Sequence, residues 1–333
     1  VQWEADEIEV RKKLAELEAS FGKKPNIVYI LADDVGYTEL GSYGGGKVRG
    51  APTPNLDKMA AQGMRFLSFY SEPECTPSRS AIMTGRHPVR NGLTQIALPG
   101  DVGLGLHAEE VTVAEALSAA GYYTGFFGKW HLGGEDEHLP INQGFDEAEW
   151  SEGNPPWWVN NRNAQATDDI GGFSQRALMY SPGPENFPYE TGGVMRGKKG
   201  ETPELVYEYS MEKYNTYDSE VADRVIEFIQ RRAQADQPFF VNFWGKGNHF
   251  WGAHPDFRDT PAGTNTAAQM VEHDYNTGRV IKTLIDLGIA ENTLVIWSSD
   301  NGPMYTVHPH GGYSLLPGAK GETREGGIRV PSL

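Results

Sequence analysis

The sequence predicts an α/β fold with a doubly wound, mostly parallel sheet and helices on both faces. Short apolar runs, typical of buried parallel strands, alternate with helical segments that end at glycine. Several of these runs end directly in charged or titratable residues, and ligands bind at such strand ends in open α/β sheets. The chain has 333 residues, of which 38% are hydrophobic, so it can bury a substantial core.

Charge and composition exclude several classes of protein. The formal net charge of -16 argues against a general nucleic-acid binder, which usually carries a basic face. We expect no membrane span, because no run approaches the roughly 20 apolar residues that a span requires. The single cysteine, Cys75, rules out an internal disulfide framework.

The chain divides into a short extension and one core. Residues 1–23 are charged and helix-favouring, and we expect a helical extension that packs on the domain through a sparse apolar stripe of Ile8, Leu14 and Leu17. The core, 24–333, begins with a predicted strand at 26–32 that ends in Asp33 and Asp34. A predicted helix at 53–63 and a predicted strand at 64–71 then lead to Cys75.

Cys75 precedes a predicted helix, since Pro77 suits a first helical turn. Free backbone N–H groups and the positive end of the helix dipole attract anions there. Arg79 lies four residues on and can lean over the same face. Taken alone, the cysteine fits an ordinary buried thiol better than a reactive centre, so the neighbouring segments decide its interpretation.

The rest of the chain continues the alternation. A Gly-rich loop at 97–107, a helix at 111–121 and a strand at 122–127 lead to Lys129 and His131. Residues 133–215 predict a long loop excursion, in which Trp157 and Trp158 either stack on a sugar or aryl ring or hold the loop to the domain. Further predicted segments are a helix at 218–234, a strand at 238–244 running on to His249, a helix at 266–288, and a strand at 293–299 that ends in Asp300 and Asn301.

The polar strand ends are expected to meet at one rim of the sheet. Their oxygen donors suit Ca²⁺ or Mg²⁺ rather than Zn²⁺; they are Asp33, Asp34, Asp300 and Asn301. Their cationic or titratable groups suit a small tetrahedral oxyanion; they are Arg79, Lys129, His131, His249 and Lys320. Together the two sets indicate a sulfate or phosphate ester as substrate.

Five segments, in order, resemble the type I sulfatases, the formylglycine-dependent and arylsulfatase-like enzymes of the alkaline-phosphatase-like superfamily. CTPSRSAIMTGR is similar to the Cys-x-Pro-Ser-Arg signature with its downstream Thr-Gly, and GYYTGFFGKWHLG to the second signature. PNIVYILADD, SDNGP and KGETREGGIRVP are similar to the remaining blocks. The resemblance covers residues 25–333.

The resemblance implies an alkaline-phosphatase-like catalytic core that hydrolyses aryl or carbohydrate sulfate esters. It implies that a maturation enzyme oxidises Cys75 to formylglycine, whose hydrate is both nucleophile and metal ligand, normally on calcium. The implied metal ligands are Asp33, Asp34, modified Cys75, Asp300 and Asn301. Arg79 would steady the hydrate, and Lys129 and Lys320 would bind sulfate oxygens. His249 would protonate the leaving oxygen, His131 would take the proton from the second hydroxyl, and Asp300 would activate the attacking one.

Two features depart from the family pattern. Gly247 and Asn248 replace the usual proline context, so His249 is placed by its distance from strand 238–244. The chain ends at Leu333, where members of that family continue into further core and a small C-terminal subdomain, so we expect that part to be missing or truncated. Family habit also suggests a periplasmic or secreted enzyme.

Two other functions remain open at this stage. A phosphate or phosphonate ester hydrolase would need the same charge arrangement. A non-catalytic binder of sulfated glycans would need Cys75 to stay an unmodified thiol.

Overall fold

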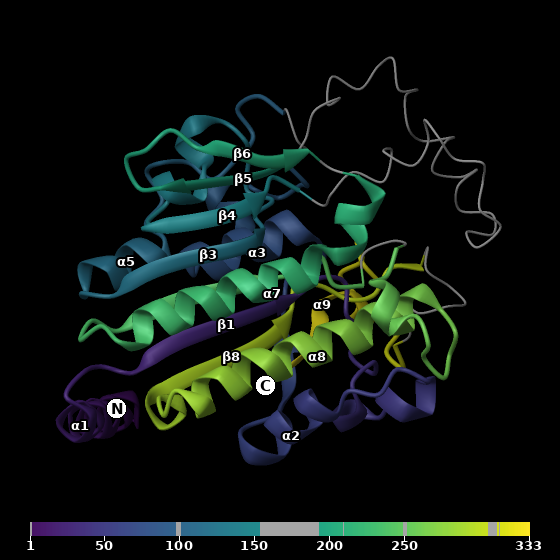
Figure 1. Cartoon of the computed structure of the whole chain (residues 1–333), viewed down its shortest axis with the longest axis horizontal. Helices are drawn as coiled ribbons and strands as arrows, with labels where there is room; N and C mark the ends of the chain where they lie inside the picture. Colours follow the sequence, from purple (N-terminus) through teal and green to yellow (C-terminus); the bar gives the residue numbers. More distant parts are fainter. Residues whose placement is uncertain are drawn as a thin grey trace.

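A nine-stranded mixed sheet forms the centre of the computed structural model (Figure 1), which describes residues 2–97, 101–153, 193–208, 210–248, 252–305, 312 and 314–333. The strand order is β2-β9-β8-β1-β7-β3-β4-β5-β6. Five central strands are parallel: β8 (Thr293–Ser299), β1 (Asn26–Ala32), β7 (Phe239–Trp244), β3 (Tyr123–Lys129) and β4 (Glu147–Ser151). The flanking strands pair antiparallel: β2 (Phe66–Tyr70), β9 (Arg329–Ser332), β5 (Gly193–Lys198) and β6 (Glu204–Glu208). The predicted fold class is confirmed.

Helices cover both faces of this sheet. In Figure 1 the long helices α7 (Met211–Ala233) and α8 (Asn265–Asp286) lie across the near face, while α3 (Cys75–Thr84) and α5 (Val113–Ala119) lie behind the sheet. The shorter helices are α2 (Pro54–Gln62), α4 (Pro88–Asn91) and α9 (Glu325–Ile328). Helix α5 begins with a capping box in which Thr112 and Glu115 satisfy each other's backbone N–H groups.

Side-chain alternation along the central strands explains the two layers. On β1, Val28 and Ile30 pack into the core on the α7 and α8 side, whereas Leu31 packs into the core on the α3 and α5 side. On β7, Val241 and Phe240 separate in the same way. Because successive strand residues point to opposite faces, an apolar run buries both faces and requires a helical layer on each.

The predicted loop excursion at 133–215 is wrong for part of the residues that the structure describes. Strand β4 extends the parallel sheet beside β3, and β5 and β6 continue it. Charged residues hide this pattern in the sequence: Glu149 on β4 pairs with Arg196 on β5 at 2.6 Å and with Arg224 on α7 at 3.6 Å. Trp157 and Trp158 lie outside the described residues.

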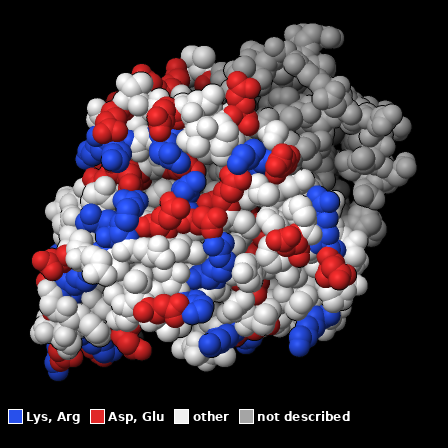
Figure 2. All heavy atoms as spheres, viewed as in Figure 1, with Lys and Arg blue, Asp and Glu red and all other residues white. Residues whose placement is uncertain are grey.

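The face shown in Figure 2 carries charges of both signs, interspersed rather than gathered into one-signed patches. Ion pairs account for part of this pattern, including Arg231 of α7 with Glu147 of β4 at 2.8 Å. Among the described residues, no helix combines the length and apolar character needed to cross a membrane.

The N-terminal extension is helical, as predicted, over α1 (Gln2–Phe21). Its expected packing is wrong at two of three positions, because Ile8 is 69% and Leu14 is 48% exposed, while Leu17 is half-buried. Ion pairs four residues apart, such as Glu9 with Lys13 at 2.8 Å, contribute a few tenths of a kcal/mol each and support the helix on its own.

Candidate active site

The carboxyl ends of three central strands bring the charged residues of the predicted site together. Asp33 and Asp34 follow β1, Lys129 ends β3, and Asp300 follows β8. Two further residues complete the cluster from outside the sheet: Cys75 as the first residue of α3, and Lys320 from the segment before α9. Cys75 therefore lies inside the helix, slightly further in than predicted, with Glu74 as N-cap.

Four buried side chains form a possible metal centre. Ligand atoms of Asp33, Asp34, Cys75 and Asp300 all lie within 4.8 Å of one another. Asn301 Nδ2 donates to Asp34 Oδ1 at 2.6 Å, whereas its Oδ1 is buried and accepts no hydrogen bond from the described residues. A buried amide oxygen beside three carboxylates fits a hard divalent cation, so the residues present suit the metal that the resemblance implies.

Two lysines flank the sulfur atom of Cys75. Lys320 Nζ lies 3.0 Å and Lys129 Nζ 3.3 Å from Sγ. Each ammonium also contacts a carboxylate, Lys320 with Asp34 at 2.6 Å and Lys129 with Asp33 at 2.7 Å. The sulfur position is therefore surrounded by fixed positive charge in a site removed from water, where such charge acts most strongly.

Arg79, in the second turn of α3, connects the ends of three strands, β8, β1 and β3. Its guanidinium donates to Asp300 Oδ2 at 2.8 Å, to Asp33 Oδ1 at 3.2 Å, and to the backbone carbonyl of Lys129 at 2.7 Å. It is fully buried, with Trp244 of β7 beneath it at 5.1 Å from the ring centroid. The planar fork of arginine suits several acceptors at once, which a lysine could not match.

Formal charge in the cluster balances before any ion is added. The carboxylates of Asp33, Asp34 and Asp300 face the cations of Arg79, Lys129 and Lys320. A divalent cation would leave two positive charges, which a sulfate monoester and a deprotonated nucleophile would together neutralise. The arrangement therefore suits the simultaneous presence of a divalent cation and an oxyanion.

Burial strongly affects the titration of this cluster. Burial raises the pKa of the Cys75 thiol well above its ordinary value, and Asp300 and Asp33 raise it further. The unmodified side chain is therefore a neutral thiol and a weak nucleophile. Burial and the Asp33 carboxylate also raise the pKa of Asp300 to about 7, although Arg79 lowers it. Ionisation of Asp300 beside Asp33 therefore depends on the nearby positive charge of Arg79 and Lys129.

His131 is held in a strained backbone conformation beside the cluster. Asp34 and His131 have φ of 60° and 62°, a region that residues other than glycine adopt infrequently and that is found at functional sites. Burial lowers the pKa of His131 well below its ordinary value, and Lys129 lowers it further. The imidazole is therefore neutral near pH 7 and able to accept a proton.

Sequence reasoning missed Thr76, which supports this conformation. Its buried hydroxyl donates to the carbonyl of His131 at 2.8 Å and accepts from the N–H of Ala97 at 3.1 Å. Its position beside Cys75 was a signal, but a threonine in a first helical turn usually only caps the helix.

Replacing Thr76 by valine should lower the free energy of unfolding by about 1–3 kcal/mol, because two buried backbone groups lose their partner. We also expect a lower kcat, since His131 would be less firmly positioned. Thr283→Val is the matched control, because the Thr283 hydroxyl donates to the carbonyl of Arg279 one turn earlier on the same helix, α8. Denaturant unfolding measures the free energy of unfolding of both variants, and steady-state kinetics measures kcat. Equal losses of stability in the two variants would contradict the role of Thr76.

His249 lies outside the described residues, but Asn248, which precedes it, lies against the metal-centre residue Asp33. Asn248 N donates to the carbonyl of Asp33 at 3.0 Å, and its side-chain amide donates to Glu39 at 3.0 Å. Glu39 also accepts from the backbone N–H groups of Gly36 and Gly312, both at 3.1 Å. This buried carboxylate, which sequence reasoning also missed, joins three segments next to the metal centre.

Comparison with known proteins identifies the family. The family model described as Sulfatase matches residues 25–333. The chain belongs to the sulfatase family. The chain is 38% identical to human arylsulfatase A over 93% of its own length, and 33% identical to canine N-acetylgalactosamine-6-sulfatase over the same share. It spans 59% and 56% of those two relatives.

A solved structure supports the same assignment. The PsFucS1 sulfatase from Pseudoalteromonas sp. superposes with a TM-score of 0.86 at 36% identity, covering 99% of this chain and 65% of that one. The central sheet and its two helical layers are therefore those of sulfatases with the alkaline-phosphatase-like fold.

Proposed function

We propose that this member of the sulfatase family hydrolyses sulfate esters to an alcohol and inorganic sulfate, with residue 75 as nucleophile. The observation that carries the proposal is the position of Cys75 Sγ, which lies 3.2 Å from Asp33 Oδ1 and about equally close to two lysine ammonium groups. A nucleophile at that point would face bound sulfate while lying within reach of the metal ligands.

The proposed cofactors are a divalent cation and formylglycine at position 75. We propose Ca²⁺, with Mg²⁺ as the alternative, because the surrounding donors are the oxygens of Asp33, Asp34, Asp300 and Asn301. When bound, the cation supplies positive charge that makes the hydrate hydroxyl of residue 75 a better nucleophile. The neutral, buried thiol explains why a maturation enzyme would be needed as a partner.

The remaining roles fall to the residues around the sulfur position. Lys129 and Lys320 would bind sulfate oxygens, and Arg79 would hold Asp33 and Asp300 in place while steadying residue 75. His131, neutral through burial, would accept the proton released when the sulfate departs. His249 would protonate the leaving oxygen, a role proposed from its place after Asn248.

The test compares nitrophenyl sulfate with nitrophenyl phosphate, because a phosphate or phosphonate ester hydrolase would use the same charges. We expect the higher kcat/KM for the sulfate ester in protein that carries the modification. A clear preference for phosphate would replace the proposed reaction. Binding of sulfated glycans without turnover, by protein with an intact Cys75 thiol, would favour the binding protein instead.

Removing divalent ions should reduce turnover by at least about 100-fold, because the charge that activates residue 75 is lost. Calcium at 100 times its Kd should add about 2.7 kcal/mol to the free energy of unfolding. Chelation followed by readdition of calcium or magnesium measures both effects and ranks the two ions. Asp33→Asn is the matched variant and should lose the calcium-dependent stabilisation; full activity in metal-free protein would exclude the metal.

We propose a sulfated carbohydrate as the substrate class, with aryl sulfates as the alternative. The support is the similarity to N-acetylgalactosamine-6-sulfatase, a relative named for its action on a sulfated sugar. A panel of sulfated monosaccharides, scored by release of sulfate, distinguishes sugar from aryl esters. We further propose a periplasmic or secreted location, which fractionation of the native host tests.

A further inference from the structure

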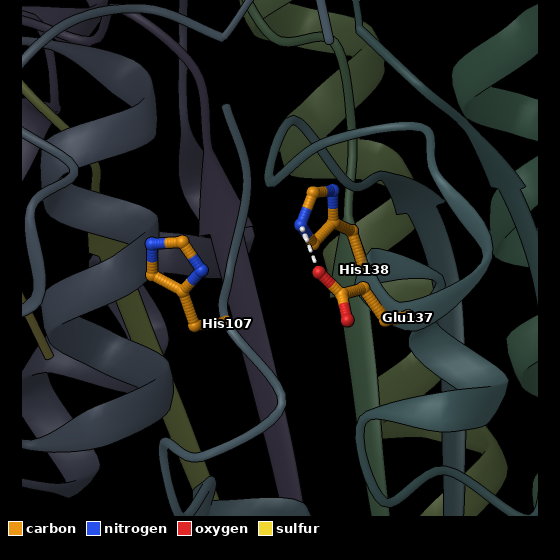
Figure 3. Close-up of side chains that lie close together, drawn as sticks. All are labelled: His107, Glu137 and His138. Atoms are coloured by element: carbon orange, nitrogen blue, oxygen red, sulfur yellow. Dashed lines mark ion pairs between the residues drawn. The ribbon is translucent and has the colours of Figure 1, made fainter. Parts of the chain in front are cut away.

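A second group of metal-binding side chains lies beside the segment that follows His131. Ligand atoms of His107, Glu137 and His138 lie within 4.8 Å of one another. Figure 3 shows His107 on one segment, and the imidazole of His138 beside the Glu137 carboxylate on another. The second segment is the 3-10 turn η3 (Asp136–His138), seven residues beyond the strained backbone of the active site.

His138 is buried in an unusual way. Its side chain is 1% exposed, yet neither ring nitrogen forms a hydrogen bond with the described residues. Glu137 Oε1 lies 3.4 Å from Nε2, and Glu135 Oε2 lies 3.9 Å from Nδ1. A buried polar group without a hydrogen bond is destabilising, so the ring nitrogen that faces Glu137 favours a ligand as partner.

The backbone makes room for this imidazole. A Cβ atom at Gly105 would lie 2.2 Å from His138 Nδ1, and one at Gly133 would lie 2.6 Å from it. The Nδ1 edge of the ring is therefore enclosed by glycine backbone. The Nε2 edge faces Glu137, whose side chain is exposed, as is His107. Nε2 itself is buried, so an ion bound to it would lie between the ring and these two exposed side chains.

We propose that His107, Glu137 and His138 bind Zn²⁺. Two imidazoles and one carboxylate form a donor set that zinc uses with water in the fourth position, whereas calcium prefers oxygen ligands. Zinc bonds of about 2.0–2.2 Å place neighbouring ligand atoms roughly 3.4 Å apart. Zinc binding would therefore require the exposed side chains of His107 and Glu137 to move closer to His138 than the present limit of 4.8 Å.

The ion would connect two segments that already contact each other near the active site. Leu106 N donates to the carbonyl of Leu132 at 2.8 Å, and Trp130 Nε1 donates to the carbonyl of His138 at 2.7 Å. Gln143 Nε2 donates to the carbonyls of Leu106 and Glu137. Zinc would thus stabilise the backbone on both sides of His131, without contact with the reacting atoms.

Zinc binding is tested on Cys75→Ala protein in saturating calcium, so that the acidic centre does not compete for zinc. Equilibrium dialysis with metal analysis should find one zinc per chain, and zinc should raise the melting temperature. His107→Ala and Glu137→Gln, both at exposed positions, should each weaken zinc binding at least 10-fold. His87→Ala is the matched control, because His87 is an exposed histidine paired with Glu72 outside this cluster, and should bind zinc unchanged.

Two results would overturn the proposal: no zinc retained after dialysis, or equal zinc affinity in His107→Ala and in the protein with His107 intact. His138→Phe gives a further check, because phenylalanine retains the ring volume and offers no ligand. It should melt normally without zinc and show no zinc-dependent shift. A shift that persists in His138→Phe would place the ion elsewhere.

Discussion

Replacing Cys75 by alanine is expected to lower kcat/KM for sulfate esters by at least about 10⁴-fold, because the variant has no nucleophile. The fold should remain, since Lys129 and Lys320 keep their carboxylate partners at Asp33 and Asp34. Steady-state kinetics on nitrophenyl sulfate measures the loss, and circular dichroism checks the fold.

Cys75→Ser provides the matched control for this prediction. The hydroxyl resembles the thiol in size but cannot become an aldehyde by the same maturation step, so we expect turnover close to that of the alanine variant. Full activity in either variant would show that residue 75 is not the nucleophile.

Replacing Arg79 by methionine is expected to lower the free energy of unfolding by about 3–5 kcal/mol, the cost of breaking a buried ion pair from one side. The guanidinium is fully buried against Asp33 and Asp300, and methionine supplies similar length without a donor. Calcium affinity should fall as well, because Arg79 aligns two of the proposed metal ligands.

A surface arginine serves as the control for Arg79. Arg86 is on the same segment of the chain and pairs with Glu110, but its side chain is 47% exposed. Arg86→Met should cost no more than about 1 kcal/mol, because exposed ion pairs are weak. Urea unfolding compares the two variants, and equal losses would contradict the structural importance of the buried pair.

Much of the central architecture followed from sequence because the signals are local. The apolar run of β1 is buried on both faces and is followed by Asp33. These few residues therefore predict a strand, its place in the centre of the sheet, and the position of Asp33 at the edge where ligands bind. The same reasoning led to Asp300 at the end of β8, and the structure places the two carboxylates on the same guanidinium.

Other features depend on partners distant in sequence. Strand β4 is stable because it pairs with β3 and because Glu149 meets Arg196, neither of which its own five residues reveal. The contacts of Glu39 with segments more than 200 residues away likewise cannot be predicted from the residues around Glu39. For α1, the residue types predict a helix correctly. They do not show whether Ile8 has a surface to pack against, and in the structure it is exposed.

Mass spectrometry of the peptide that carries Cys75 tests the central claim most directly. The sample should be protein that hydrolyses nitrophenyl sulfate, made in a host with the maturation enzyme. We predict an aldehyde or its hydrate at position 75. An intact thiol throughout a preparation that turns over sulfate esters at full rate would contradict the proposed mechanism.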